Sequence, residues 1–184
     1  MGEKGIIFPD LSELKTGTPR QKAAYVALTG NRIMEKLAPW TPVLAGTIPL
    51  NIDREESDLD ILCCADDLPD FREHIGKVFG HHAGFSVFER TAQNEPAVVA
   101  RFICDGFPVE LFAQRIPVSR QYAFRHLLIE RELLKIHGED FRRHITALKK
   151  SGLKTEAAFA QLLGITGDPY EQLLVYGADK LDIR

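Results

Sequence analysis

Short apolar runs in the middle of the chain predict five strands. Three of these runs lie close together, at Phe85–Phe88, Ala97–Ile103 and Val109–Phe112, and two earlier ones lie at Val43–Ala45 and Asp58–Cys64. Apolar runs of this length that are bounded by Gly, Pro, Asn or Asp are typical of strands. Asp105-Gly106, between the runs Ala97–Ile103 and Val109–Phe112, predicts a tight hairpin turn. The Asn-Glu-Pro sequence at 94–96 predicts another turn.

Apolar spacing and boundary residues predict helices in most of the remaining chain. A short helix is expected to start within Pro9–Leu14, a longer one is expected over Pro19–Leu37, and a third over Leu68–Phe79. The segment after the strands predicts four more: Ser119–Ile136, Asp140–Ser151, Thr155–Leu163 and Asp168–Val175. Gly138, Gly152 and Gly167 mark the expected helix ends.

This order of elements predicts an α/β chain of the α+β type. Strand-helix alternation together with hairpins favours a mixed sheet flanked by helices. We expect residues 1–115 to form this α/β core and residues 116–184 to form a helical region packed on it. No segment rich in Gly, Ser or Pro separates the two parts, so the helices are expected to wall one side of a cleft.

Two carboxylates at the start of the second strand are the strongest functional signal. Asp58 and Asp60 alternate with apolar residues, so both side chains point to one face, roughly 7 Å apart. An oxygen-rich pair of this kind suits a hard divalent cation such as Mg²⁺. The preceding Gly46-Thr47 turn offers close backbone approach and a hydroxyl, which favours a phosphate. The alternative is a strand entrance whose acids only stabilise a turn.

The stretch from Gly46-Thr47 to Ser57-Asp58-Leu59-Asp60-Ile61 resembles the signature of the nucleotidyltransferase superfamily related to DNA polymerase beta. The resemblance implies that fold, with a third carboxylate on a later strand, where Glu110 fits. It also implies that Asp58, Asp60 and Glu110 are catalytic and bind Mg²⁺ or Mn²⁺, and that Gly46, Thr47 and Ser57 contact an NTP substrate.

Over nearly its whole length the chain also resembles a small, mostly bacterial family of unknown function assigned to this fold. That resemblance includes Lys154–Phe159 and Gly167–Tyr170. Three positions depart from the superfamily pattern: Thr47 replaces the usual Ser, Pro49 removes one amide, and Glu110 replaces the commoner Asp. None of these changes removes a metal ligand.

Further candidates come with alternatives of their own. His126 and Glu130 have i, i+4 spacing on one helix face and either line a nucleotide or acceptor pocket or form a surface pair. Arg125 is a candidate for triphosphate binding, although a helical Arg is more often solvated. For Glu110 the alternative is an ion pair with Arg101, and Asp105 is its competitor for the third carboxylate.

Composition limits the class of protein and its partners. Of the 184 residues 45% are hydrophobic and 27% charged, and the net charge is −3, as in ordinary globular proteins. Extended nucleic-acid binding is therefore not expected. The three cysteines lack metal spacing, and no apolar run suits a signal peptide or a membrane span. We expect a cytoplasmic protein that does not bind membranes.

The sequence favours a metal-dependent nucleotidyltransferase that moves a nucleoside monophosphate from an NTP to an acceptor. The acceptor remains open among a small molecule, an RNA end and a protein, and the oligomeric state is not readable. One alternative is a nucleotide-binding or regulatory module of the same fold without turnover. Another is a structural protein whose acids only form ion pairs.

Overall fold

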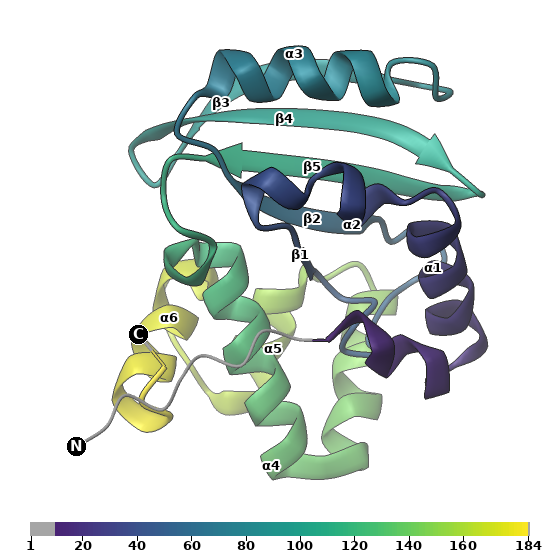
Figure 1. Ribbon diagram of the computed structural model, residues 1–184. Helices are drawn as coiled ribbons and strands as arrows, with labels where there is room; N and C mark the ends of the chain where they lie inside the picture. Colours follow the sequence, from purple (N-terminus) through teal and green to yellow (C-terminus); the bar gives the residue numbers. More distant parts are fainter. Residues whose placement is uncertain (1–9, 184) are drawn as a thin grey trace.

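The computed structural model describes residues 10–183, and a five-stranded sheet lies at its centre (Figure 1). Its strands are β1 (Val43–Ala45), β2 (Leu59–Cys64), β3 (Ser86–Ala92), β4 (Glu95–Cys104) and β5 (Phe107–Gln114). Their order across the sheet is β1-β2-β5-β4-β3. Only β2 and β5 pair in parallel, whereas the other neighbours are antiparallel. The predicted mixed sheet is confirmed.

Helices cover both faces of the sheet (Figure 1). On one face lie α1 (Pro19–Gly30), α2 (Ile33–Lys36) and α3 (Leu68–Phe79), with short 3₁₀ turns at Leu11–Thr16 and Ala38–Trp40. The other face carries α4 (Tyr122–Lys150), α5 (Thr155–Leu163) and α6 (Pro169–Lys180), after a 3₁₀ turn at Val118–Arg120. Each set of helices shares an apolar core with its face of the sheet. Among the described residues, no helix is both long enough and apolar enough to cross a membrane.

The alternation of side chains decides which face the central carboxylates occupy. The residues of β2 and β5 that join the core under α1 and α3 are Leu59, Ile61, Cys63, Val109, Leu111 and Ala113. Asp60 and Glu110 lie between these residues, and successive strand side chains point to opposite faces. Both carboxylates therefore face the C-terminal helices, on the side where Leu62 and Phe112 join the second core.

The predicted C-terminal helices are largely confirmed. Within α4, Gly138 has φ 74° and ψ −164°, which interrupts the helix where the sequence places a stop. Figure 1 shows the chain turning there, so that the second helical segment runs back toward the sheet. Asp168 accepts a hydrogen bond from the Glu171 amide and so caps α6, as its position before Pro169 suggests.

Several boundary predictions differ from the structure by a few residues, and three of the errors have local reasons. The single helix expected over Pro19–Leu37 ends after Gly30, and Arg32 adopts a left-handed φ of 54° before α2 begins. Glycine is a poor helix former. In addition, the side-chain amide of Asn31 donates to the Ala27 carbonyl and so competes with the backbone hydrogen bonds of the helix.

The other two errors concern the β3–β4 hairpin. Its turn lies at Gln93 and Asn94, which have φ of 52° and 61°, rather than at 94–96. Pro96 lies inside β4. The strand before this turn runs over Ser86–Ala92, so it starts after Phe85 and extends well beyond Phe88. Most of its side chains are exposed, so the second half of the strand has few apolar residues by which the sequence could reveal it.

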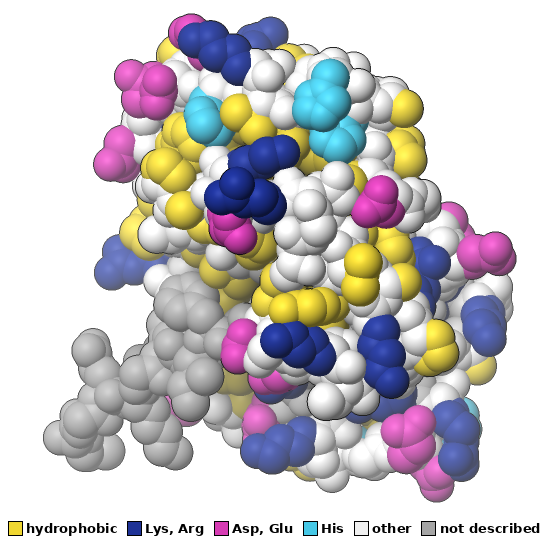
Figure 2. All heavy atoms as spheres, turned by 45° about the vertical axis from the view of Figure 1, so that its right-hand side comes forward, with side chains coloured by type: hydrophobic (Ala, Val, Ile, Leu, Met, Phe, Trp, Pro, Cys, Tyr) yellow, Lys and Arg dark blue, Asp and Glu magenta, His cyan; other side chains and the backbone are white. Residues whose placement is uncertain are grey.

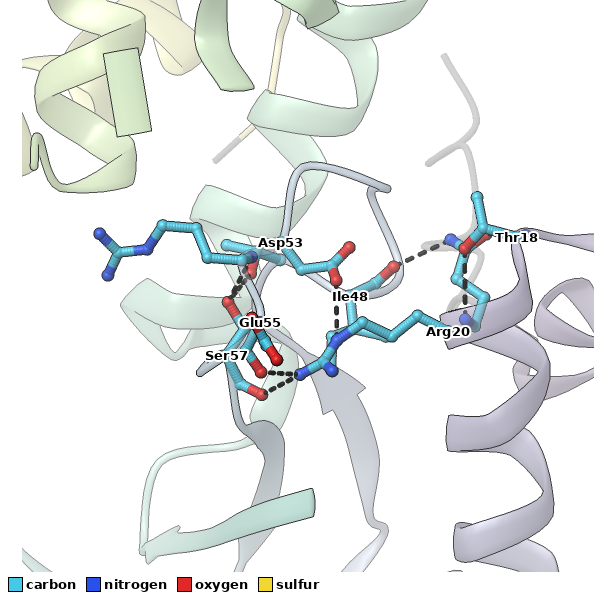
Figure 3. Close-up of polar contacts among 9 residues, drawn as sticks. Thr18, Arg20, Ile48, Asp53, Glu55 and Ser57 are labelled. Carbon is cyan, nitrogen blue, oxygen red and sulfur yellow. Dashed lines mark hydrogen bonds and ion pairs between the residues drawn. The ribbon is translucent and has the colours of Figure 1, made fainter. Parts of the chain in front are cut away.

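The loop between β1 and β2 is fixed by side chains from α1 (Figure 3). Arg20 donates to the carbonyls of Glu55 (2.6 Å) and Ser57 (3.0 Å) and forms an ion pair with Asp53 (3.0 Å). Gln21 donates to the Ile48 carbonyl at 2.9 Å. On the other side of the loop, Arg142 of α4 donates to the Leu50 carbonyl. The loop that carries the phosphate-site candidates is therefore held from both helical layers.

Replacing Arg20 tests this anchoring. Arg20→Ala leaves Asp53, whose side chain is only 10% exposed, without its cation and two carbonyls without a donor. We expect the free energy of unfolding to fall by about 2–4 kcal/mol, measured by urea denaturation. The control is Lys22→Ala, which removes the same charge from an exposed position of α1 and should change stability by less than about 0.5 kcal/mol. Equal effects of the two changes would contradict the anchoring role.

Candidate functional site

Asp60 and Glu110 lie side by side at the centre of the sheet. The parallel pairing of β2 with β5 places the two residues opposite each other in register. Asp58 precedes β2 by one residue, two positions before Asp60. Burial, reinforced by the negative charges of Asp58 and Glu110, raises the pKa of Asp60 to about 8. The fold thus concentrates carboxylates where their charge is poorly solvated, which favours a bound cation or proton.

Gly46 makes room for the Asp60 carboxylate. It has φ +72°, and a Cβ built on it would lie 2.1 Å from Oδ2 of Asp60. The pairing of β1 with β2 brings this about, because Ala45 lies opposite Asp60. From the sequence, Gly46 was expected to leave space for a ligand. In the structure the Asp60 side chain occupies the space that a Cβ at residue 46 would need, so glycine is favoured here whether or not a ligand binds.

A cavity of about 560 Å³ opens between these carboxylates and the C-terminal helices. Thr47, Asp60 and Glu110 line it from the sheet side. Opposite them the lining residues are His126, Glu130, Glu156 and Tyr170, which come from α4, α5 and the start of α6. This is the cleft that the sequence predicts, and it contains six of the candidate residues, namely Gly46, Thr47, Asp60, Glu110, His126 and Glu130.

Three buried side chains in this cleft have polar atoms without hydrogen-bond partners among the described residues: Gln114, Gln121 and His126. Both amide atoms of Gln114 and both ring nitrogens of His126 are unpartnered, whereas Gln121 lacks a partner only for its Oε1, because its amide nitrogen donates to two carbonyls. Burial also lowers the pKa of His126 to about 4. Because buried polar groups normally have partners, Gln114 and His126 are the strongest candidates to contact a ligand.

A second cavity of about 340 Å³ adjoins the first and contains basic residues. The two share Thr47, Asp60, Thr155 and Glu156. Further lining residues of the second cavity are Arg54, Ser57, Asp58, Lys149 and Lys154. Its lining therefore combines the Ser-Asp motif with three cations and with the acids Glu56, Asp58, Asp60 and Glu156. We call it the basic cavity, because the larger cavity has a single Lys or Arg in its lining.

Sequence reasoning did not identify Lys149 or Arg54 as site residues. Lys149 is only 4% exposed, and burial lowers the pKa of its ammonium group. A signal for it was present, because Lys149 follows the buried Ile145 by four positions and so shares its helix face. Arg54 is held in place by an ion pair with Glu56 and by donating to the Lys149 carbonyl. That contact joins distant parts of the chain and leaves no local pattern.

Other sequence candidates have mixed positions. The Ser57 hydroxyl accepts hydrogen bonds from the Arg54 amide (2.9 Å) and the Thr47 hydroxyl (3.4 Å). Arg125 lines neither cavity, and its guanidinium lies 5.8 Å from the ring centre of Tyr122. Its role in triphosphate binding stays a prediction that this position does not favour.

Glu110 forms the ion pair that the sequence offered as its alternative role. The Arg101 guanidinium lies 2.8 Å from its carboxylate, with Arg101 58% and Glu110 16% exposed. Glu110 also lines the cleft, so its role as the third carboxylate stays a prediction that the ion pair does not displace from the site. Its competitor Asp105 sits in the β4–β5 hairpin turn with φ 47° and accepts from Asn31, which favours the turn role for Asp105.

Two features of the C-terminal helices bear on the site. Thr155 is the first residue of α5, as the predicted bounds have it, and Lys154 occupies the cap position without a side-chain hydrogen bond. Thr155 lines both cavities. His126 and Glu130 are not a surface pair, because both are buried at the cleft.

A protein-family model described as "Domain of unknown function (DUF4269)" matches residues 26–176. The chain belongs to this family. No curated protein sequence gives a significant match to this DUF4269 protein.

Solved structures with a similar fold include the Cid1 poly(U) polymerase bound to MgGTP, at 13% identity and a TM-score of 0.52 over 70% of this chain and 41% of that one. A structure of a GLD-2/RNP-8 complex matches at 12% identity and a TM-score of 0.53, over 92% of this chain and 65% of that one. The polymerase core of the TRAMP RNA surveillance complex matches at 11% identity and a TM-score of 0.50, over 94% of this chain and 56% of that one. The DUF4269 protein thus spans less than two thirds of each of these chains, and its fold is similar to nucleotidyltransferase folds.

The raised pKa of Asp60 predicts that the free energy of unfolding of the metal-free protein depends on pH. Between about pH 4 and pH 8 the unfolded chain has lost the Asp60 proton while the folded chain keeps it, so stability falls as pH rises. Asp60→Asn removes this dependence. We expect the variant to be more stable than wild type by about 1–3 kcal/mol at pH 8, with the difference vanishing near pH 4.

Urea denaturation in the presence of a chelator measures this difference. Asp66→Asn, at an exposed position beyond the end of β2, is the matched control and should stay within about 0.5 kcal/mol of wild type at both pH values. A destabilised Asp60→Asn variant at pH 8 would instead show that the carboxylate is held by structural partners.

Proposed function

We propose that this protein is a metal-dependent nucleotidyltransferase that moves a nucleoside monophosphate from an NTP to an acceptor. The observation that carries the proposal is the placement of Asp60 opposite Glu110, two residues after Asp58, at the point where an open cleft meets a basic cavity. The similar fold of the Cid1 poly(U) polymerase bound to MgGTP supports it.

The carboxylates fit a hard divalent cation. Asp58, Asp60 and Glu110 offer only oxygen donors, the type that Mg²⁺ and Mn²⁺ prefer. The raised pKa of Asp60 reflects excess negative charge, which a cation relieves. When bound there, the metal ion supplies charge neutralisation at the reacting phosphate. We assign these three residues as its ligands.

The basic cavity suits the triphosphate. Lys149, Lys154 and Arg54 supply positive charge around Thr47 and Ser57, whose hydroxyls lie at the same cavity. The α phosphate then lies near Asp60, which lines both cavities. In this arrangement the basic side chains align the leaving pyrophosphate and stabilise its charge.

The larger cavity suits the nucleoside and the acceptor. Gln114 and His126 supply unpartnered polar atoms for hydrogen bonds to the ligand, and Tyr170 supplies an aromatic surface. We assign to Glu110 the positioning and deprotonation of the acceptor hydroxyl, with Arg101 fixing its carboxylate. A general base must reach the proton it removes, and Glu110 faces the cleft.

The charge distribution favours an acceptor that is not a long nucleic acid. The titratable residues that line the larger cavity are Asp60, Glu110, Glu130, Glu156, Glu171, Arg90, Tyr122, His126 and Tyr170. Five of these are acids, and Arg90 is the only Lys or Arg among them. Figure 2 shows acidic and basic side chains interspersed over one face of the molecule, without a broad basic patch there. A polyanion gains little from such surfaces.

A second candidate function is nucleotide binding without turnover. The observation that favours it is the Arg101–Glu110 ion pair, which occupies the carboxylate that the transfer mechanism uses. Such a module would bind an NTP with Mg²⁺ through the same cavities and release no pyrophosphate.

Turnover by wild type and by Glu110→Gln separates these functions. We expect wild type to release pyrophosphate from at least one NTP with Mg²⁺ or Mn²⁺, through slow hydrolysis or self-modification if no acceptor is added. Glu110→Gln should lower that rate by about 100-fold or more while changing NTP affinity by less than about 3-fold, since the interaction is made mainly in the transition state.

The control is Glu73→Gln, an exposed acid on α3 on the other face of the sheet, which should leave both quantities unchanged. Binding without turnover in wild type would establish the module. Equal turnover in wild type and Glu110→Gln would reduce Glu110 to an ion-pair partner.

A further inference from the structure

Three potential metal ligands, distinct from the sheet carboxylates, meet on the helical wall of the larger cavity. They are His126 and Glu130 of α4 and Glu156 of α5. One ligand atom from each lies within 4.8 Å of the others. The spacing of His126 and Glu130 is i, i+4, which places them on the same face of the helix, and α5 packs beside α4 so that Glu156 completes the group.

The imidazole of His126 points to a missing ligand. The residue is 3% exposed, yet neither ring nitrogen has a hydrogen-bond partner. Its ring packs 4.4 Å from the ring of Tyr170, which limits its freedom to turn away. A buried polar group without a partner is costly, and a metal ion in the cleft would satisfy one of these nitrogens.

The charges around the cluster leave room for a cation. Glu130 is 4% exposed and Glu156 is partly buried, so two carboxylates share one site. The neighbouring cation is Lys149, whose charge acts on both carboxylates. One ammonium group offsets one carboxylate, so a bound cation would balance the charge of the second.

We propose that His126, Glu130 and Glu156 form a transition-metal site whose preferred occupant is Zn²⁺. One imidazole nitrogen and two carboxylate oxygens form a mixed donor set that suits Zn²⁺. The all-oxygen set at Asp58, Asp60 and Glu110 suits Mg²⁺ instead. Ligand bonds of about 2.0–2.2 Å would draw the three donors closer together than they lie now, which rotation of the two Glu side chains can achieve.

Three protein ligands leave an open coordination position that faces the cleft. Zinc sites of this kind bind water or a substrate atom in the fourth position. The site would therefore hold an oxygen or nitrogen of whatever molecule enters the cavity. It depends on the residues of α4 and α5 alone and does not require that the protein transfers nucleotides.

Zinc binding by the full chain tests the proposal. After chelator treatment, titration with Zn²⁺ should show one tight site per chain, and X-ray absorption at the zinc edge should show a single imidazole ligand. Loss of an outer-shell contact lowers metal affinity by about 10–100-fold, so loss of a ligand in His126→Leu or Glu130→Gln should lower it by at least about 10-fold.

Two controls locate the site. His144→Ala removes an exposed histidine of the same helix, and Asp60→Asn removes a sheet carboxylate; both variants should keep the affinity and the imidazole signal. Glu130→Gln keeps the size of the buried side chain, so it serves if His126→Leu fails to fold. The proposal is overturned if wild type binds no Zn²⁺, if Glu130→Gln binds it as tightly as wild type, or if Asp60→Asn abolishes it.

Discussion

The fold buries Asp60 next to two other carboxylates, Asp58 and Glu110, and this unfavourable concentration of negative charge is the constraint on which the candidate site depends. The parallel pairing of β2 with β5 places Asp60 opposite Glu110, and Gly46 has no Cβ that would displace the carboxylate. Structural residues rarely accumulate like charges in a partly buried position, because each one raises the cost of ionising the others. A carboxylate with a pKa of about 8 is more typical of a functional site than of a structural ion pair.

The surrounding elements place positive charge close to these acids. The β1–β2 loop, held by Arg20 from one layer and Arg142 from the other, carries Arg54 and Ser57 to the edge of the basic cavity. The end of α4 brings Lys149 to the same place. The proposed site for a negatively charged ligand and the proposed site for a cation therefore adjoin, which is the arrangement that metal-assisted phosphate chemistry requires.

Local pattern was sufficient for much of the fold and for the central motif. The helix Leu68–Phe79 has the predicted bounds because its apolar spacing is regular and Asp67 caps it. Asp60 was identifiable as a candidate because an acid interrupts the apolar strand β2, and Asp58 because it lies two positions earlier, just before that strand. By contrast, the contacts of Arg20 with the loop and of Arg54 with α4 join segments far apart in sequence. The division of the chain near residue 115 and the cytoplasmic location stay predictions.

The measurement that tests the central claim most directly is calorimetric titration of Mg²⁺ into the protein in the absence of nucleotide. Mg²⁺ is the appropriate ion because an imidazole site disfavours it, so the titration reports on the sheet carboxylates. The account predicts that wild type and Asp66→Asn bind Mg²⁺ equally, whereas Asp60→Asn loses most of the affinity while remaining folded. Unchanged Mg²⁺ binding in Asp60→Asn would contradict it.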